Sequence, residues 1–409
     1  MVPRNKLKIL NDPIYGFITI PNELIFDIIE HKYFQRLRRI SQMGLSYLVY
    51  PGAHHTRFLH ALGCMHLMQK AVEVLGRKGV EISSEEEEAL YVAILLHDVG
   101  HGPFSHAMEN SIVEGVSHEG ISSRFMHEMN RDFAGKLDLA IAIFNGEYPR
   151  KFLCQLISSQ LDMDRLDYLK RDSFYTGVVE GNINSERLIS MLNVMNDELM
   201  VEEKGIYSVE EFLLARRLMY WQVYLHKTGV AAEQLLIRVL KRVKELFQTG
   251  HRPFAGTALT YFLETKVTQE QFDLETLETF ARLDDSDILA AMKEWVYEED
   301  FVLRNLCQMI VNRDLLKVVV SETPVSQDEV ANQLKLVADR NGLTQHEASY
   351  FVFSGEITNT AYKMKDDEIK ILYKDGSVRD VVDASDHFNL KALASPVTKY
   401  YICYPKPKD

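Results

Sequence analysis

The feature that most constrains this chain is a block of ten residues, 97–106, that contains three histidines, one aspartate, two glycines and a proline. The block follows residues 89–96, which carry no charged side chain and are predicted to form a buried helix. Core packing does not explain so many polar and conformationally special residues at the end of an apolar helix. We therefore expect this helix to end at a functional site.

The first two residues of the block, His97 and Asp98, combine an imidazole nitrogen with a carboxylate oxygen. This mixture of donors suits Mn, Fe, Zn or Mg ions that act on phosphates. Nine of the 14 histidines lie between His54 and His127, a density that favours a metal site over ordinary packing.

Two other segments could complete the ligand shell, residues 57–63 with His60 and residues 161–168 with Asp164. On a helix, Asp164, Tyr168 and Asp172 would be spaced by four residues and share one face. Taken alone, such a face is more typical of a solvated, charged surface. This face indicates a metal site only in combination with the block at 97–106.

Helical periodicity dominates the chain, and strand patterns are concentrated towards its C-terminus. We therefore predict a mostly α fold with a small C-terminal α+β module. The predicted segments are an extended stretch over 7–20, amphipathic helical stretches from 22 and over 34–43, a helix from a Ser84–Glu87 capping box to about Gly100, long helices over 151–172 and 209–247, helical structure over 266–350, hairpin strands over 369–373 and 378–381 with a turn at Asp375-Gly376, and a strand over 397–404. The predicted divisions are 1–250, 251–350 and 351–409.

The composition restricts the class of protein further. The net charge of −13 argues against a non-specific nucleic-acid binder, which would usually be basic. We find no run of about 18 apolar residues and no secretory signal pattern at the N-terminus, so we expect no membrane span. The four cysteines are far apart and form no CxxC pair, which favours free thiols and a cytoplasmic location.

The order His60, His97-Asp98, Asp164 resembles the H…HD…D pattern that names the HD superfamily of phosphohydrolases. The resemblance is closest to the deoxynucleoside triphosphate (dNTP) triphosphohydrolases of that superfamily. It rests on motifs spread over about residues 8–230, at 11–16, 34–38, 51–58, 97–106, 162–172 and 224–227. The resemblance implies a helical HD-domain fold and hydrolysis of a nucleotide.

The resemblance also implies roles for individual residues. The implied ligands of one divalent ion (Mn, Fe, Mg, Zn or Ni) are His60, His97, Asp98 and Asp164. The implied catalytic residues are His118 as general acid and His101 and His106 as contacts of the α-phosphate. The implied substrate contacts are Gln42, Met43, Arg57, Arg165, Tyr168, Asp172, Tyr224 and His226. The reaction would be attack of a metal-activated water on the α-phosphorus, which releases deoxynucleoside and tripolyphosphate.

One departure from the family pattern bears on the substrate. Gln222 stands where a mammalian member has an arginine that grips the triphosphate, which puts strict triphosphate specificity in question. Arg216, Arg217 or Lys227 could supply the missing cation. The alternative functions are an HD phosphohydrolase of another nucleotide or phosphomonoester, and a nucleotide-responsive binding or scaffold protein with a relict site.

A regulatory nucleotide site is a further implication of the resemblance, because the mammalian member binds an activating guanine nucleotide. The matching positions here are Lys8, Gln35, Arg36 and Arg38, with Glu30 nearby in place of an aspartate. Surface ion pairs are the alternative role for the two arginines. A homo-oligomer, dimer or tetramer, is likewise implied by the resemblance.

Overall fold

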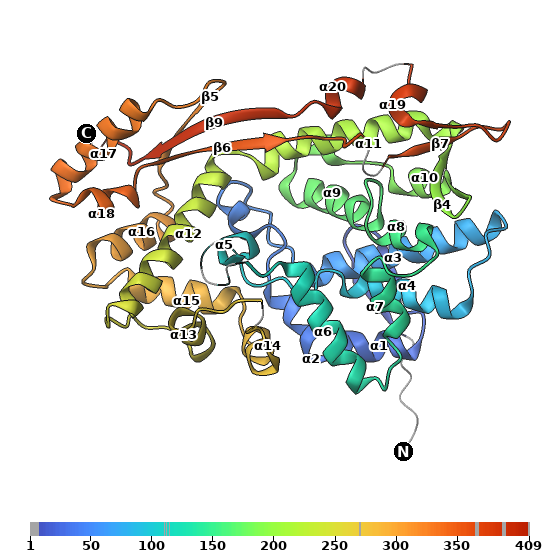
Figure 1. Ribbon diagram of the computed structural model, residues 1–409, viewed down its shortest axis with the longest axis horizontal. Coiled ribbons are helices and arrows are strands. Elements are labelled where there is room, and N and C mark those ends of the chain that lie inside the picture. The colour runs from blue at the N-terminus through green and yellow to red at the C-terminus, as the bar shows by residue number, and fades with distance from the viewer. Residues whose placement is uncertain are drawn as a thin grey trace.

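The structure is a computed structural model that describes residues 8–109, 111, 113, 115–269, 271–364, 368–386 and 390–407. Within these ranges the side chains of His106, Lys391 and Ala392 are not described. The fold is mostly helical, with small sheets at the N-terminus, on one flank and along one side (Figure 1). The predicted class, a mostly α HD-type fold with strands towards the C-terminus, is confirmed.

The first part of the chain places the helices that surround the histidine block. These helices are α1 (Glu23–Glu30), α2 (Lys32–Gln35), α3 (Arg57–Arg77), α4 (Ser84–Leu96), α5 (Ser105–Glu109), α6 (His118–Asp132), α7 (Asp138–Phe144), α8 (Lys151–Ile157), α9 (Met163–Thr176) and α10 (Ser185–Ser190). Short 3-10 turns cover Arg36–Arg39, Gly44–Leu48, Val179–Gly181 and Glu203–Gly205.

Helix α4 is the central helix, and it is buried on every side from Ala89 to Leu96. An apolar surface around the whole circumference is what a helix enclosed by others requires. Its capping box is formed by Ser83 and Glu86, so the prediction of Ser84 and Glu87 was wrong by one residue. The helix ends at His97, which is its C-cap.

The later helices form the remainder of the body. They are α11 (Ile206–Met219), α12 (Lys227–Gln248), α13 (Thr257–Glu264), α14 (Leu274–Ala281), α15 (Asp285–Trp295), α16 (Phe301–Val311), α17 (Gln327–Asn341), α18 (Gln345–Ser349), α19 (Val381–Ala384) and α20 (Leu390–Ala394). A π-helical turn, Tyr220–Tyr224, separates α11 from α12.

The two long helices predicted over 151–172 and 209–247 are each interrupted. Asp162 accepts hydrogen bonds from the backbone amides of Ser159 and Arg165, so it ends the loop after α8 and caps α9. His226 caps α12 in the same way, through its Nδ1 and the amide of Thr228. The stretch over 34–43 is likewise helical only as far as Arg39, after which Ser41 forms a bridge with Thr56.

The strands form three small sheets. They are β1 (Ile9–Asp12), β2 (Gly16–Thr19), β3 (Leu192–Met195), β4 (Glu198–Glu202), β5 (Lys317–Ser321), β6 (Phe353–Asn359), β7 (Lys370–Leu372), β8 (Val378–Asp380) and β9 (Val397–Tyr404). The sheet orders are β1-β2, β3-β4-β7-β8 and β5-β9-β6. Of these, β1-β2 covers the stretch predicted as extended over 7–20.

The predicted hairpin and the predicted last strand are confirmed as β7-β8 and β9. Their partners lie earlier in the chain, because β7 pairs in parallel with β4 and β9 pairs with β5. The long strands β6 and β9 run along one side of the body, at the top of Figure 1. The C-terminal strands are therefore hydrogen-bonded to β4 and β5, which lie in the first and second predicted divisions. The three predicted divisions stay a prediction.

Among the described residues, no helix combines the length and apolar character that crossing a bilayer requires.

Candidate metal and substrate site

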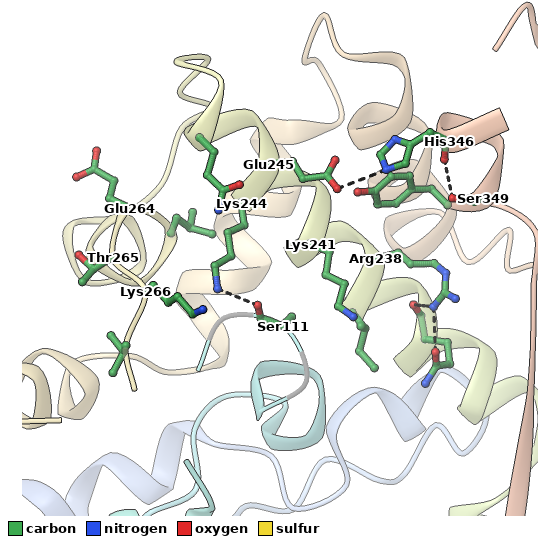
Figure 2. Close-up of a pocket in the computed structure, with 16 residues that line it drawn as sticks. Ser111, Arg238, Lys241, Lys244, Glu245, Glu264, Thr265, Lys266, His346 and Ser349 are labelled. Carbon is green, nitrogen blue, oxygen red and sulfur yellow. Dashed lines mark hydrogen bonds and ion pairs between the residues drawn. The ribbon is translucent and has the colours of Figure 1, made fainter. Parts of the chain in front are cut away.

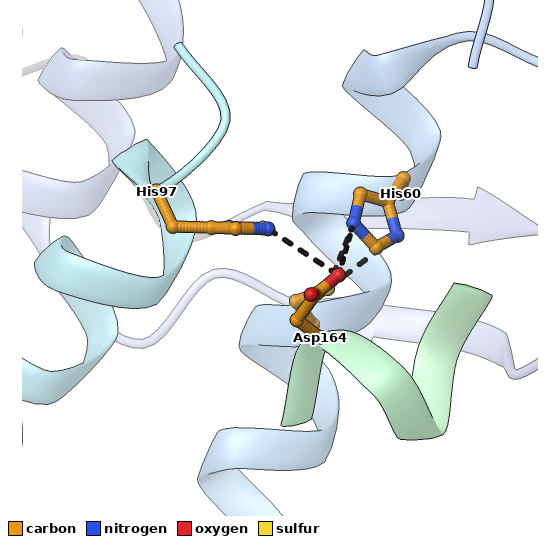
Figure 3. Close-up of side chains that lie close together, drawn as sticks. His60, His97 and Asp164 are labelled. Atoms are coloured by element: carbon orange, nitrogen blue, oxygen red, sulfur yellow. Dashed lines mark hydrogen bonds and ion pairs between the residues drawn. The ribbon is translucent and has the colours of Figure 1, made fainter. Parts of the chain in front are cut away.

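Three helices bring the four predicted ligands to one place. His60 comes from the first turn of α3, His97 and Asp98 from the end of α4, and Asp164 from the first turn of α9. Asp164 Oδ1 lies 3.1 Å from His60 Nε2 and 3.6 Å from His97 Nε2 (Figure 3). Asp98 lies 3.5 Å from His97 Nε2 and 3.8 Å from His60 Nε2.

These separations fit a divalent ion. Ligand atoms about 2.1 Å from one ion lie roughly 3.0–3.4 Å apart in octahedral or tetrahedral geometry. The Nδ1 of His97 contacts the backbone oxygen of Ile94 at 2.6 Å, which directs Nε2 into the cluster. That Nε2 is buried without a hydrogen-bond partner in the described structure, an arrangement that a metal bond would satisfy.

The charge state of Asp164 suits a cation. Burial alone would raise the pKa of Asp164, but its close contacts with His60 and His97 outweigh burial and hold the pKa well below the usual range. The geometry and the ionised carboxylate together mean that these residues could hold a metal ion. The His60, His97 and Asp164 atoms, with Cys64 Sγ, lie within 4.8 Å of one another.

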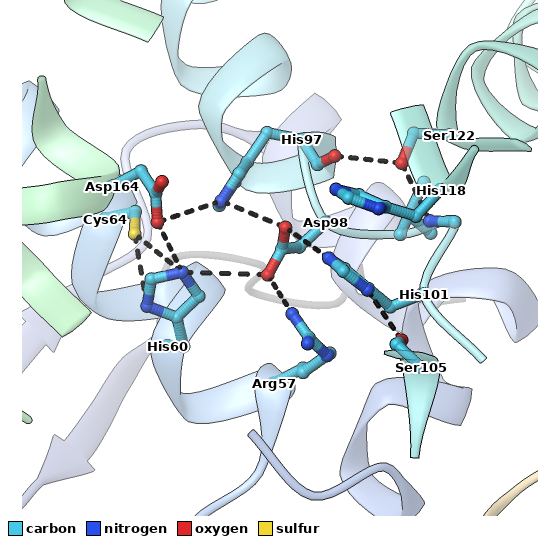
Figure 4. Close-up of polar contacts among 12 residues, drawn as sticks. Arg57, His60, Cys64, His97, Asp98, His101, Ser105, His118, Ser122 and Asp164 are labelled. Carbon is cyan, nitrogen blue, oxygen red and sulfur yellow. Dashed lines mark hydrogen bonds and ion pairs between the residues drawn. The ribbon is translucent and has the colours of Figure 1, made fainter. Parts of the chain in front are cut away.

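Asp98 contacts two further side chains besides these histidines. Its Oδ2 forms an ion pair with Arg57 Nη1, and its Oδ1 lies 3.1 Å from His101 Nε2 (Figure 4). The loop that carries it approaches α6 closely, since Ser122 Oγ accepts from the amide of Gly100 at 2.8 Å and donates to the carbonyl of His97 at 2.8 Å. A Cβ on Gly100 would lie 2.2 Å from the backbone of α6, which explains the glycine.

A buried chain of charges holds His60 in place, and the sequence analysis did not identify it. His60 Nδ1 lies 2.8 Å from Asp167 Oδ2, and Arg171 contacts both oxygens of Asp167 at 2.8 and 2.9 Å. Arg171 also donates to Asp12 at 2.8 Å. Burial would raise the pKa of Asp167, but the charge of Arg171 outweighs it and the pKa falls to about 2.

The sequence contains a signal for this buried chain of charges. Asp167 and Arg171 are an i, i+4 pair on the helix of Asp164, and Asp12 belongs to the motif at 11–16. A carboxylate that orients a metal-binding imidazole is a common arrangement around metal sites. Gly63 is required beside it, because a Cβ there would lie 2.0 Å from Asp167 Oδ1.

Two of the three predicted catalytic histidines, His101 and His118, lie on the other side of Asp98. The rings of His101 and His118 stack with centroids 3.9 Å apart, and His118 Nδ1 lies 3.0 Å from Glu109 Oε1. Burial would lower the pKa of His118, but the hydrogen bond with Glu109 and the charge of Glu119 outweigh it and raise the pKa. The side chain of His106 lies outside the described residues.

A cavity of about 660 Å³ opens beside the cluster, a size within the range of small-ligand sites. The predicted substrate contacts that line it are Gln42, Met43, Arg57, Arg165, Tyr168, Asp172 and Tyr224. Asp98, Asp164, His101 and His118 line it as well. His226 is not among the lining residues, and its side chain caps α12 instead.

Asp172 is held by two neighbours. Its Oδ1 lies 2.7 Å from His55 Nε2, and its Oδ2 accepts from Tyr224 Oη at 2.7 Å. His55 was not predicted as a site residue, yet it is buried, and its ring stacks on that of Tyr175 with centroids 4.4 Å apart. One edge of the cavity is thus fixed by hydrogen bonds before any ligand binds.

Gln222 is not among the residues that line the cavity, and its side-chain amide donates to Glu180 at 3.2 Å. Arg216, one of the three cations suggested as a substitute, is buried, and its Nε and Nη1 have no hydrogen-bond partner in the described structure. Its charge acts on Tyr168, which lines the cavity. Of the suggested substitutes, Arg216 has the surroundings that fit best.

The four residues predicted for a regulatory nucleotide have different surroundings. Arg36 is buried and donates from Nη1 to the carbonyls of Val99 and His101 at 2.9 and 2.8 Å. Arg38 stacks on Phe58 and donates to Gln35 at 2.9 Å. Lys8 lies over the ring of Phe26. The guanidinium of Arg36 therefore supports the loop after α4.

Comparisons with known proteins agree with the geometry. The HD domain matches residues 57–172, and the HD associated region matches residues 183–255. A phosphohydrolase structure from Bacteroides thetaiotaomicron VPI-5482 is 51% identical, covers 98% of this chain and 100% of its own, and superposes with a TM-score of 0.95.

Two curated proteins extend the comparison. The uncharacterized protein YwfO of Bacillus subtilis strain 168 is 35% identical, over 78% of this chain and 73% of its own length. The deoxynucleoside triphosphate triphosphohydrolase SAMHD1 homolog of Dictyostelium discoideum is 29% identical, over 89% of this chain and 70% of its own length.

Proposed function

The chain belongs to the HD-domain phosphohydrolases, and we propose that its substrates are dNTPs, which it cleaves to deoxynucleoside and tripolyphosphate. The observation that carries the proposal is the cavity beside the His60, His97, Asp98 and Asp164 cluster. It combines basic, aromatic and amide side chains within one space, the groups that phosphates, a sugar and its hydroxyl would contact. The likeness to the Dictyostelium discoideum triphosphohydrolase supports the same substrate class.

The phosphates would lie between the ligand cluster and the cations. Arg57 and Arg165 line the cavity together with Asp98 and Asp164, and the charge of the buried Arg216 acts on Tyr168. The chemistry that a divalent ion supplies in such a site is to lower the pKa of a water and to offset charge on the phosphate. Cations fixed before the substrate binds stabilise the transition state because they need not reorganise.

His118 would donate the proton that the leaving 5′ oxygen requires. Its raised pKa keeps a larger share of the imidazole protonated near neutral pH, and Glu109 holds its Nδ1 in position. Glu119, the partner of Nε2 at 3.2 Å, is largely exposed, so its carboxylate can move aside for a substrate. Stacking on His101 sets the plane of the ring.

The sugar would lie against Tyr168, with Gln42 and Met43 at its 3′-hydroxyl. Tyr168 packs edge-on against Tyr224, which is itself hydrogen-bonded to Asp172. A ring fixed in this way excludes an added 2′-hydroxyl by its volume, and this exclusion is the proposed source of the preference for deoxynucleotides.

The proposal is tested by product analysis over dNTPs, NTPs and nucleoside monophosphates, with and without added Mn²⁺. The expected result is metal-dependent release of deoxynucleoside and tripolyphosphate from dNTPs, with much slower turnover of NTPs. Release of orthophosphate from monophosphates instead would favour the second candidate, a phosphomonoesterase of the same family. The position of Gln222, outside the cavity and without a cation, is the observation that favours this second candidate.

A further inference from the structure

A second large cavity, of about 590 Å³, lies on α12 away from the HD cluster (Figure 2). Helix α12 lines both cavities, the first with Gly229, Glu233 and Leu236 and the second with Arg238 and Lys241, among others. The end of α13 and helix α18 complete the second cavity.

The second cavity is cationic in a chain whose net charge is −13. Four cationic side chains line it, Arg238, Lys241, Lys244 and Lys266, against two acidic ones, Glu245 and Glu264. Figure 2 shows Lys241 and Lys244 projecting from α12 and Lys266 facing them from the other side. Such a local reversal of sign inside a concave surface concentrates anions.

Both acidic side chains already have cationic partners of their own. Glu245 lies 3.2 Å from Arg242 and 3.8 Å from His346, and Glu264 lies 3.0 Å from Arg252. In the described part of the chain, no carboxylate lies within ion-pair distance of Lys241 or Lys266. Lys241 and Lys266 therefore add positive charge to the cavity that no carboxylate of the described residues offsets.

Arg238 provides a fixed element of this cavity. Its Nη1 donates to the carbonyl and to the side-chain oxygen of Gln234 at 3.0 and 2.9 Å, and its guanidinium stacks on Phe353. Burial lowers the pKa of Arg238 to about 10, which leaves it charged at neutral pH. An oriented, partly dehydrated guanidinium is well suited to bind phosphate oxygens.

We propose that this cavity, lined by Arg238, Lys241, Lys244 and Lys266, is a second binding site for a ligand that carries a chain of phosphates. The spacing of the cations favours a chain over a single phosphate. Arg238 and Lys244 are six residues apart, which separates them by roughly 9 Å along the helix axis. One phosphate group cannot contact both side chains at once without drawing them together, whereas successive phosphates can.

The site is connected to the catalytic region through one short segment. Lys244 Nζ donates to the carbonyl of Ser111 at 3.2 Å, and Ser111 Oγ donates to the carbonyl of Ala107, which lines the first cavity. Glu109, the partner of His118, lies between these two residues in the sequence. A ligand that draws Lys244 towards itself would therefore act on the segment that positions Glu109.

The test is calorimetric titration of the full chain in EDTA with inorganic tripolyphosphate, orthophosphate and a dNTP whose α,β-bridging oxygen is replaced by methylene. The titrated proteins are the wild type, the double variant Lys241→Glu/Lys266→Glu, and a control double variant Lys136→Glu/Lys374→Glu with the same change in net charge at exposed lysines elsewhere. Hydrogen exchange locates the bound ligand, because peptides over 241–248, 263–267 and α18 line only the second cavity, whereas peptides over 41–46 and 164–172 line only the first. The measurement needs neither turnover nor metal, so its outcome is independent of the proposed reaction.

We expect tripolyphosphate to bind the wild type and the control alike, and Lys241→Glu/Lys266→Glu to lose this binding by about tenfold or more, as loss of one charged hydrogen bond already predicts. Only the binding that Lys241→Glu/Lys266→Glu loses and the control keeps is assigned to the second cavity. If this binding is tighter for the nucleotide than for tripolyphosphate, the ligand is a nucleotide, and if the two bind equally, the ligand is a polyphosphate. Equal affinity of both double variants would overturn the proposal, and so would protection of the second-cavity peptides by orthophosphate as strong as by tripolyphosphate.

Discussion

Replacing Asp167 by asparagine tests whether the buried charge chain behind His60 governs the proposed metal site. Asp167 Oδ2 contacts both His60 Nδ1 and Arg171 Nε, and its Oδ1 accepts from Arg171 Nη2. An asparagine must place its NH₂ group against donors in either orientation. The orientation that keeps the contact with His60 loses only the bond at Oδ1, and it leaves a neutral acceptor behind the imidazole.

The expected effects differ in size and kind. Loss of one hydrogen bond to a buried charged group costs about 1.5–3 kcal/mol of folding free energy. Loss of the carboxylate behind a ligating histidine typically lowers metal affinity by about 10–100-fold. Metal affinity is measured by elemental analysis after dialysis against buffered Mn²⁺, and stability by the midpoint of urea unfolding.

Asp12→Asn is the matched control, because Asp12 binds the same arginine and does not contact His60. Asp12 Oδ1 accepts from the amides of Ile14 and Tyr15, so an asparagine would keep that contact and turn its NH₂ towards Arg171. We expect a similar loss of stability with metal affinity close to the wild type. If Asp12→Asn weakens metal binding as much as Asp167→Asn, or if Asp167→Asn binds metal normally, the buried chain of charges serves only to support the fold.

Three further predictions concern the proposed roles. Asp164→Ala should lose both bound metal and turnover. His118→Ala should keep the metal and lose turnover by about 10²–10⁴-fold, as expected for a general acid. Full metal occupancy with normal turnover in Asp164→Ala would contradict the assignment of Asp164 as a ligand. A general acid must be protonated, so kcat should fall as pH rises through the pKa of His118. Since Glu109 raises this pKa, Glu109→Gln should move the decline in kcat to lower pH. If the decline does not move, it does not report the protonation of His118. For the regulatory site, GTP or a dNTP should change the rate on a second dNTP in the wild type and not in Arg38→Ala, measured beside sizing chromatography; a flat response in the wild type would exclude it.

Predictions from the sequence succeeded where one local pattern decides the structure. The apolar run over 89–96 can only be an enclosed helix, and alternation with a turn at Asp375-Gly376 defines the β7-β8 hairpin. Predictions of helix length failed where a side-chain cap begins a new helix. The loop before Asp162 and the π turn before His226 both continue an apolar periodicity, so only their capping bonds reveal the helix ends.

The residues of the proposed site likewise fall into those that a local motif predicts and those that only contacts reveal. The four proposed ligands are recognisable because each belongs to a motif of its own, and α3, α4 and α9 bring those motifs together. His55 and Glu109 are single side chains whose importance arises only from contacts across more than one helix or loop. The pair Asp167 and Arg171 is visible as an i, i+4 pattern, but its contact with His60 is not. The parallel pairing of β7 with β4 is likewise non-local, since neither strand carries a signal for its partner.

Arg36 provides the last prediction, because the sequence and the structure assign it different roles. Its guanidinium is buried near the rings of Phe125 and Phe280, and it donates to the carbonyls of Val99 and His101. Arg36→Met keeps a similar volume and removes a buried charge that has no carboxylate within ion-pair distance among the described residues. Relief of the dehydration of this charge offsets the loss of its two hydrogen bonds, so the free energy of unfolding should change little.

The same change leaves those two carbonyls without their donor and loosens the loop that carries Asp98. A displacement of about 1 Å at a reacting centre can cost on the order of 10²-fold in rate, so kcat should fall steeply while the urea midpoint stays near that of the wild type. A regulatory arginine gives the opposite pattern, since basal turnover would persist and only activation by GTP would disappear. Measuring basal kcat, activation and the urea midpoint on one Arg36→Met preparation therefore decides between the two roles.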